Sequence, residues 1–333
     1  MIITKHVIKG LGVDIDITAH VLAGVEDGPT LLLTSMLHGR EWSPVLIIRE
    51  LLKRLDIGTL KGNIIAIPVA NALAFDPDTR RLMDNTDEPD ANWPARGPNH
   101  LSGTISRVIE KEFMTHANYL IDYRASSRGR MMANTGYRAN YEDMSATKAS
   151  TGMALAYGFP VLRETSPFAG DGAGCGTMTP AWANSGIPAI TPEIGGLSED
   201  APRDWIDANV AGLMGILKFL GMLDGNPSYC EKYLQVGDLW RISPMNGGYV
   251  ELAMGSPSLL AGVQEGQLLA RIISPRTFET IEELRSPGDG YIIHSRGNCM
   301  THPGGCVFGI ADAKTSVWMA INVPAPQAEA AVA

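Results

Sequence analysis

The sequence predicts an α/β domain followed by a small all-β domain. Up to about residue 228, short apolar runs of strand length alternate with amphipathic helical patterns, which is typical of helices packed on a sheet. Beyond that point the segments are Gly-rich and β-branched, as in GGYVELAMG and GGCVFGIAD, which indicates short strands joined by turns. With 333 residues, 45% of them apolar, the chain is long enough for two domains. We therefore expect an α/β domain over 1–228, a β-barrel or sandwich over 229–321 and a flexible tail over 322–333.

Short apolar segments bounded by polar, Gly or Pro residues supply the predicted strands of the first domain. Because these segments are apolar at almost every position, they are typical of strands buried on both faces of a largely parallel sheet. The segments are 30–36, 63–70, 119–123, 159–163 and 188–192.

Amphipathic helices are predicted between these strands. The first begins near Ser43, which we expect to act as N-cap with Pro44 at the first helical position. Its apolar residues, among them Ile48, Leu51 and Leu55, form one stripe. Similar patterns predict helices over 104–117, 145–157 and 204–223.

Composition and charge exclude several classes of protein. The net charge is -9, and no basic run could supply the phosphate contacts of a nucleic-acid-binding protein. No apolar run approaches the roughly 20 residues that a membrane helix needs, and the start MIITKHVIKG does not have the pattern of a signal peptide. The four cysteines form no CxxC pair, which is typical of idle thiols in a reducing compartment. We expect a cytoplasmic protein with neither nucleic acid nor membrane as partner.

The segment LLLTSMLHGREWSP contains the most informative pair of residues. His38 and Glu41 lie on a short loop between a predicted buried strand and a predicted helix. Ligands of open α/β sheets collect at the carboxyl ends of the strands, and an imidazole nitrogen with a carboxylate oxygen is a familiar donor pair for Zn²⁺. An HxxE pattern alone is weak evidence, so a loop histidine beside a solvated glutamate is the alternative interpretation.

Several motifs, in this order, resemble the succinylglutamate desuccinylase/aspartoacylase family. They are His-Gly-x-Glu after the first strand, IPVANALAF (67–75), DANWPARG (90–97), GIPAITPEIGG (186–196) and the C-terminal GGYVELAMGSPSLLAGVQEGQLLARI. The resemblance covers most of the chain. It implies a zinc carboxypeptidase-like mixed sheet flanked by helices, with a lipoyl-like β-domain appended to it.

The resemblance also implies an activity, which is metal-dependent hydrolysis of an amide bond. One zinc ion per chain would be held by His38 and Glu41, and Glu193 would be the general base. Arg80 or Arg81 would polarise the scissile carbonyl. The residues expected to bind substrate are Asn92, Arg124 and Arg128. We expect the substrate to be a small N-acylated amino acid or a related amide that carries a carboxylate, because arginines suit such a group.

The chain departs from the family at its third zinc ligand. The family has a histidine where this chain reads IDYRASSRG, with Arg124 at that position, and a guanidinium has no lone pair for a metal. Four interpretations stay open: another ligand, a metal held by two side chains and water, a metal-free reaction around Arg124, or a small-anion-binding protein without catalysis. The residues considered as a replacement ligand are Asp122, Asp84, Asp87, Asp90, His100 and His116.

Other polar features receive simpler interpretations. His294 and His302 are expected to be surface or turn residues, and SSRGR (126–130) is expected to be a basic loop past the Arg124 strand. The turn SPGDGY (286–291) contains no lysine, so lipoyl attachment is not expected. The β-domain or a helix face is the expected surface for forming a homo-oligomer.

Overall fold

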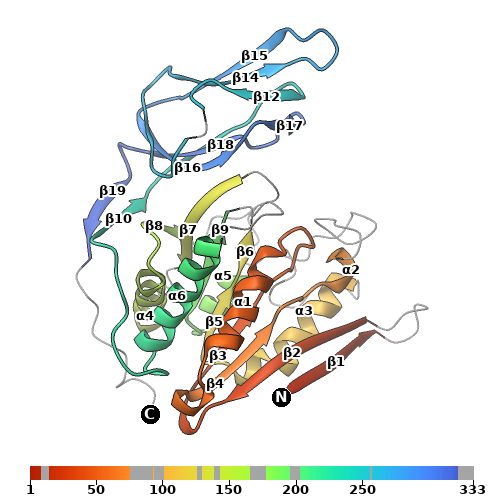
Figure 1. The fold of residues 1–333 in the computed structure, drawn as a ribbon, viewed down its shortest axis with the longest axis vertical. Helices are drawn as coiled ribbons and strands as arrows, with labels where there is room; N and C mark the ends of the chain where they lie inside the picture. Colours follow the sequence, from red (N-terminus) through yellow and green to blue (C-terminus); the bar gives the residue numbers. More distant parts are fainter. Residues whose placement is uncertain are drawn as a thin grey trace.

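The computed structural model has an α/β part with an all-β part at one end of it (Figure 1). It describes residues 1–8, 15–75, 93, 101–125, 130–138, 143–165, 178–195, 203–255 and 257–321. In the α/β part, helices lie on both faces of a twisted sheet (Figure 1). The fold class is therefore as predicted, a mixed α/β sheet of the zinc carboxypeptidase-like type with additional β-sheets after it.

The central strands of the sheet run parallel to one another, in the order β4, β3, β5, β9. Their bounds are Lys61–Ile67 for β4, Glu26–Thr34 for β3, Tyr119–Asp122 for β5 and Ala189–Ile194 for β9. A short strand, β6 (Arg124–Ala125), follows β5 and also pairs in parallel with β9. Because these strands are parallel, their carboxyl ends meet at one edge of the sheet.

Strands of opposite direction flank this parallel centre, which makes the sheet mixed. On one side β2 (Ile15–Ala23) pairs antiparallel with β4, and β1 (Ile2–Ile8) pairs antiparallel with β2. On the other side β7 (Arg130–Arg138) pairs antiparallel with β9 and in parallel with β8 (Val161–Thr165). Neither β1, β2 nor β7 was predicted, because none of them is a continuous apolar run in the sequence; in the first half of β2 buried and half-buried residues alternate.

The two faces of the sheet are covered by different helices. One face packs against α1 (Ser43–Arg54), α4 (Met144–Tyr157) and α6 (Arg203–Phe219). The other packs against α3 (Leu101–Glu112) and α5 (Met178–Asn184), with the single turn α2 (Ala72–Phe75) near them. Leu31 and Leu33 belong to the first core and Leu32 to the second, which explains the unbroken apolar run of β3. None of the described helices is both long and apolar enough to cross a membrane.

The predicted strands and helices of this part are all present, with shifted ends. The first strand ends at Thr34, because Met36 turns the chain with a positive φ of 52°. The N-cap prediction was wrong: Trp42 is the N-cap of α1, it makes no side-chain cap bond, and Ser43 is already helical. The predicted helix 104–117 ends at Glu112 and is followed by a 3-10 turn at Met114–His116. Another 3-10 turn, Ile57–Thr59, lies between α1 and β4.

After α6 the described residues form strands and turns alone. Strands β15, β14, β12 and β17 make a four-stranded sheet, and β16, β18, β11 and β13 pair beside it. A separate apolar core, including Val250, Ile292 and Phe308, fills the space between them. The bounds are β10 (Lys232–Val236), β11 (Leu239–Ile242), β12 (Gly248–Leu252), β13 (Gly262–Val263), β14 (Leu268–Ile273), β15 (Thr280–Arg285), β16 (Gly290–Arg296), β17 (Cys299–Thr301), β18 (Phe308–Asp312) and β19 (Val317–Ala320).

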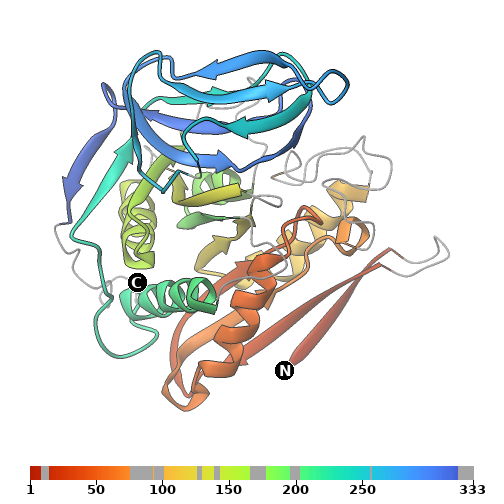
Figure 2. The same ribbon diagram turned by 45° about the horizontal axis from the view of Figure 1, so that its top comes forward.

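Two strand pairings join the parts into one extended sheet. Strand β16 pairs antiparallel with β7, and β10 pairs in parallel with β8 (Figure 2). His294 is opposite Met132 in this junction and is buried, so its prediction as a surface residue was wrong. Arg130 belongs to β7 and not to a loop, while His302 is exposed as predicted. The domain bounds 1–228, 229–321 and 322–333 stay a prediction.

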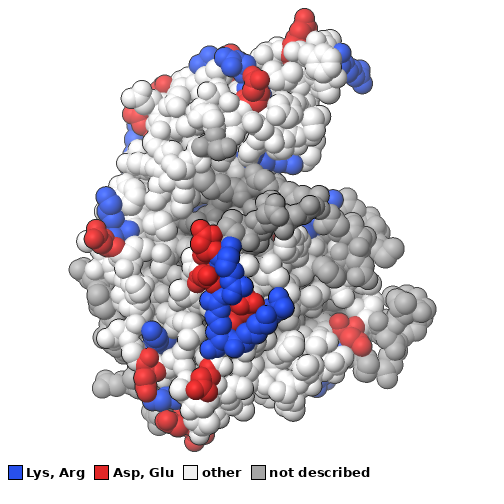
Figure 3. Space-filling model, viewed as in Figure 1, with Lys and Arg blue, Asp and Glu red and all other residues white. Residues whose placement is uncertain are grey.

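On the outside of the α/β part, acidic and basic side chains gather over α1 and α6 (Figure 3). Ion pairs connect the two helices there, from Arg54 to Asp207 and from Arg203 to Glu50. The Lys53 ammonium, which is hydrogen-bonded to Glu50, holds the pKa of that carboxyl below its usual value, and burial opposes this effect. The partners other than Glu50 are partly or largely exposed, and ion pairs at a surface contribute little to stability. We assign this cluster to the packing of α1 on α6 and not to a binding site.

Candidate active site

The loop after β3 is fixed by a buried asparagine from the turn after β4. The side-chain amide of Asn71 donates a hydrogen bond to the Leu37 carbonyl at 3.1 Å, and its backbone N–H donates to the Met36 carbonyl at 3.1 Å. The Asn71 carbonyl oxygen accepts a bond from the backbone N–H of Ala74 at 3.3 Å. Asn71 lies within the motif IPVANALAF, but no role in the site was predicted for it. The structure shows that it holds the loop that carries His38.

His38 and Glu41 lie together in this loop, as predicted for a pair three residues apart. His38 Nδ1 is 2.8 Å from Glu41 Oε1, and the Glu41 backbone N–H donates to the His38 carbonyl at 3.1 Å. Both side chains are buried. The loop therefore presents an imidazole and a carboxylate to one another at the carboxyl end of β3.

Arg124 lies against this pair and is held there by Asp122. The Arg124 Nε and Nη2 atoms are each 2.7 Å from Asp122 Oδ2. The other carboxylate oxygen, Oδ1, accepts a hydrogen bond from Thr34 Oγ1 at 2.7 Å. On its far side, Arg124 Nη1 is 3.4 Å from His38 Nδ1. A continuous polar chain thus runs from β3 through β5 and β6 to the His38 loop.

Glu193 joins this cluster through the strand register. Arg124 is the direct partner of Glu193 in the pairing of β6 with β9, and Asn134 of β7 is opposite Glu193 on its other side. Directly opposed residues point to the same face of a sheet, so the side chains of Arg124 and Glu193 share one face. Glu193 is half-buried. The tertiary structure therefore brings Glu193 next to Arg124.

The carboxylates of Asp122 and Glu41 lie in the same buried region as the Arg124 guanidinium. Burial raises the pKa of Asp122 above its usual value, and the nearby negative charge of Glu41 raises it further; the Arg124 charge and the Thr34 hydrogen bond act in the opposite direction. A positive side chain is therefore enclosed between negative ones, in a region with little access to water.

The other predicted site residues are distributed as follows. Arg80, Arg81, Asn92 and Arg128 are outside the described residues, and so are Asp84, Asp87, Asp90 and His100. Trp93, in the motif DANWPARG, is buried in the core on the α3 and α5 face. Thr34 and Asn71 were not predicted as site residues. Thr34 is the polar last residue of the otherwise apolar end of β3, and Asn71 follows β4 within the motif IPVANALAF.

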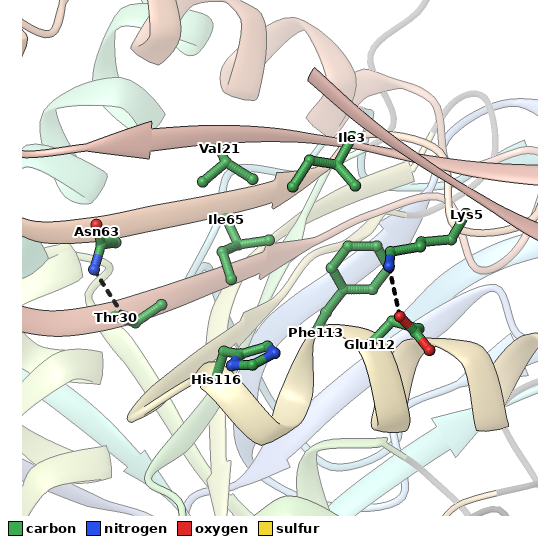
Figure 4. A pocket seen from close by; sticks show the side chains of 9 residues that line it. All are labelled: Ile3, Lys5, Val21, Thr30, Asn63, Ile65, Glu112, Phe113 and His116. Atoms are coloured by element: carbon green, nitrogen blue, oxygen red, sulfur yellow. Dashed lines mark hydrogen bonds and ion pairs between the residues drawn. The ribbon is translucent and has the colours of Figure 1, made fainter. Parts of the chain in front are cut away.

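His116 is not near His38, so it does not replace the third ligand. It lines a pocket of about 440 Å³ at the opposite edge of the sheet, close to Thr30 and Asn63 (Figure 4). An ion pair from Lys5 to Glu112, 2.6 Å long, lies in the same pocket, whose apolar lining includes Phe113. His116 precedes β5, whereas the site lies beyond the end of β5.

The described residues do not fit a zinc site with three protein ligands. Among them there is no group of three or more His, Cys, Asp and Glu side chains that could hold a metal ion. His38 and Glu41 supply two donors, and the side chain beside them is a guanidinium that carries positive charge and has no lone pair. Asp122, a candidate replacement ligand, is bonded to that guanidinium and to Thr34. We therefore derive no reaction step through a metal.

These features define an α/β protein of carboxypeptidase-like architecture with a polar cluster at the carboxyl ends of its central strands. Residues 27–220 match the family model described as the succinylglutamate desuccinylase/aspartoacylase catalytic domain, and the chain belongs to that family. The family takes its name from a desuccinylase and an acylase, both of which are amide-bond hydrolases.

Individual relatives agree with this assignment. The chain is 22% identical over 300 residues to the N-alpha-acetyl-L-2,4-diaminobutyric acid deacetylase of Halomonas elongata, covering 87% of this chain and 84% of that protein. It superposes on the product-bound ectoine utilization protein EutE (DoeB) of Ruegeria pomeroyi with a TM-score of 0.76, at 22% identity over 90% of each chain. An aspartoacylase family protein of Mesorhizobium loti gives a TM-score of 0.75 at 19% identity, covering 93% and 94%. At these identities the solved structures support the fold alone.

Proposed function

We propose that this protein is a hydrolase that cleaves the amide bond of a small N-acylated amino acid or of a related amide with a carboxylate. The observation that carries the proposal is the direct pairing of Arg124 with Glu193, next to the His38 and Glu41 pair. A base and a cation at the carboxyl ends of parallel strands are suited to bind and hydrolyse such a molecule. The homologous deacetylase of Halomonas elongata supports the reaction class.

Each of these residues has a chemical role in the proposal. The Glu193 carboxylate takes a proton from the attacking water and later passes it to the leaving nitrogen. The Arg124 guanidinium stabilises the negative charge that develops on the carbonyl oxygen, or holds the substrate carboxylate. His38 and Glu41 form the adjacent wall of the site. The roles predicted for Arg80, Arg81, Asn92 and Arg128, the cytoplasmic location and the homo-oligomer remain predictions.

The test is replacement of Glu193 by Gln, which keeps the size of the side chain and removes its basicity. With a panel of N-acetyl and N-succinyl amino acids, we expect kcat to fall about 10²- to 10⁴-fold while binding is largely retained. The matched control is Glu112→Gln, because Glu112 pairs with Lys5 in the pocket at the other edge of the sheet. This control should leave the rate unchanged.

Two results would contradict the proposal. If Glu193→Gln hydrolysed the panel as fast as the unmodified protein, Glu193 would not be the base. If the unmodified protein bound members of the panel without hydrolysing any of them, the chain would be a small-anion-binding protein. Comparison of acidic with neutral amides tests the carboxylate requirement, which equal turnover of both classes would refute.

A further inference from the structure

Arg124 is a fixed part of the site and not a mobile arm. Its side chain and that of Asp122 are both buried, with 8% and 1% of their surfaces exposed. Two of its nitrogens contact the same oxygen of Asp122, and Thr34 holds the other oxygen of that carboxylate. A buried charge that loses its partner is strongly unfavourable, so Arg124 and Asp122 stabilise each other in this position.

The position of the guanidinium matters because of what lies on its other side. His38 Nδ1 is 2.8 Å from Glu41 Oε1 and 3.4 Å from Arg124 Nη1. A zinc ion bound by Nδ1 and Oε1 would be roughly 2.0 to 2.2 Å from each atom, and therefore close to Nη1. A doubly charged ion and a guanidinium repel each other at such a separation, and burial reduces the screening of that repulsion by water.

From this geometry we infer that Arg124 supplies the positive charge of the site in place of a divalent metal ion. Asp122 and Thr34 act as positioning residues, because they hold the guanidinium against the His38 and Glu41 pair. His38 and Glu41 then bond to each other instead of to a metal. The use of this charge in catalysis rests on the proposed function. The replacement of the metal is tested by measuring bound zinc, which needs no substrate turnover.

The experiment uses Zn²⁺ alone as the probe, on the full chain purified without chelator. Zinc per chain is measured by equilibrium dialysis and elemental analysis, and circular dichroism confirms that each variant is folded. The unmodified protein should hold far less than one zinc ion per chain. Arg124→His removes the guanidinium and adds an imidazole beside His38 and Glu41, so we expect about one zinc ion per chain.

Two further variants are controls for this gain. The double variant Arg124→His/His38→Ala should lose the zinc, because the new site needs the His38 imidazole. Arg49→His places a histidine on an exposed position of α1 and should bind no more zinc than the unmodified protein.

The outcomes separate clearly. About one zinc ion per chain in the unmodified protein, lost in His38→Ala, would overturn the inference whether or not Arg124→His folds. A folded Arg124→His that gains no zinc would overturn it as well, because Arg124 would then not be what keeps the metal out. Neither result depends on the rate of Glu193→Gln, so failure of this inference is distinguishable from failure of the proposed function.

Discussion

Replacement of Asn71 by Ala tests whether the His38 loop is positioned by the turn after β4. Asn71 is fully buried, and its side chain makes one hydrogen bond to Leu37 and one to Ala74. Each bond contributes about 1 kcal/mol, and a Leu37 carbonyl left buried without this donor adds about 1 kcal/mol. We expect the free energy of unfolding to fall by about 2 to 3 kcal/mol.

The same change should also lower activity, because the loop carries the His38 and Glu41 pair. Arg124 lies against this pair, with Nη1 3.4 Å from His38 Nδ1. A shift of its guanidinium by about 1 Å costs about 100-fold in rate, so a loss of this order in kcat/KM is expected. Stability is measured by urea unfolding and activity with the best amide substrate found in the panel. The comparison between the two measurements shows whether the loss arises from the loop or from unfolding.

Asn63→Ala is the matched control for this test. Asn63 is a half-buried residue near the start of β4, and its side-chain amide donates a hydrogen bond to Thr30 Oγ1 at 3.3 Å. Its removal should cost about 1 kcal/mol or less and leave kcat/KM unchanged. If Asn71→Ala were as stable and as active as Asn63→Ala, the loop would be positioned by other contacts and the reasoning would be refuted.

The remaining predictions concern stability. Gly152→Ala in α4 should lower the free energy of unfolding by about 1 to 3 kcal/mol, because the added methyl group would overlap the buried ring of Phe219; an increase measured by urea unfolding would show that the ring can move. Asp143 caps α4, and hydrogen bonds from Ser145 and Ala146 lower its pKa below 3.8. The stabilisation by the Asp143 carboxylate is therefore present above about pH 4 and is lost as the pH falls through the lowered pKa. Asp143→Ala should lower the thermal unfolding temperature at pH 7. At low pH the variant and the unmodified protein should differ less. An equal destabilisation at both pH values would refute the assignment.

The sequence by itself determined the parallel centre of the fold and the local part of the site. Strands such as β3 are recognisable because both of their faces are buried, and that requires an unbroken apolar run. His38 and Glu41 meet because they are three residues apart in a loop between a strand and a helix, so their contact depends on local geometry. The predicted strand 188–192 stopped one residue before Glu193, which lies in β9 (Ala189–Ile194).

Only the tertiary structure decided which distant residues complete the site. Thr34 and Asp122 are 88 residues apart and His38 and Arg124 are 86 apart, and they meet because β3, β5 and β9 are neighbours in the sheet. The pairing order of strands depends on the packing of the whole chain and not on any one segment. The same reason applies to His294, which is buried because β16 pairs with β7. The spacing of residues along the chain determines which side chains share a face, and the global packing determines which faces meet.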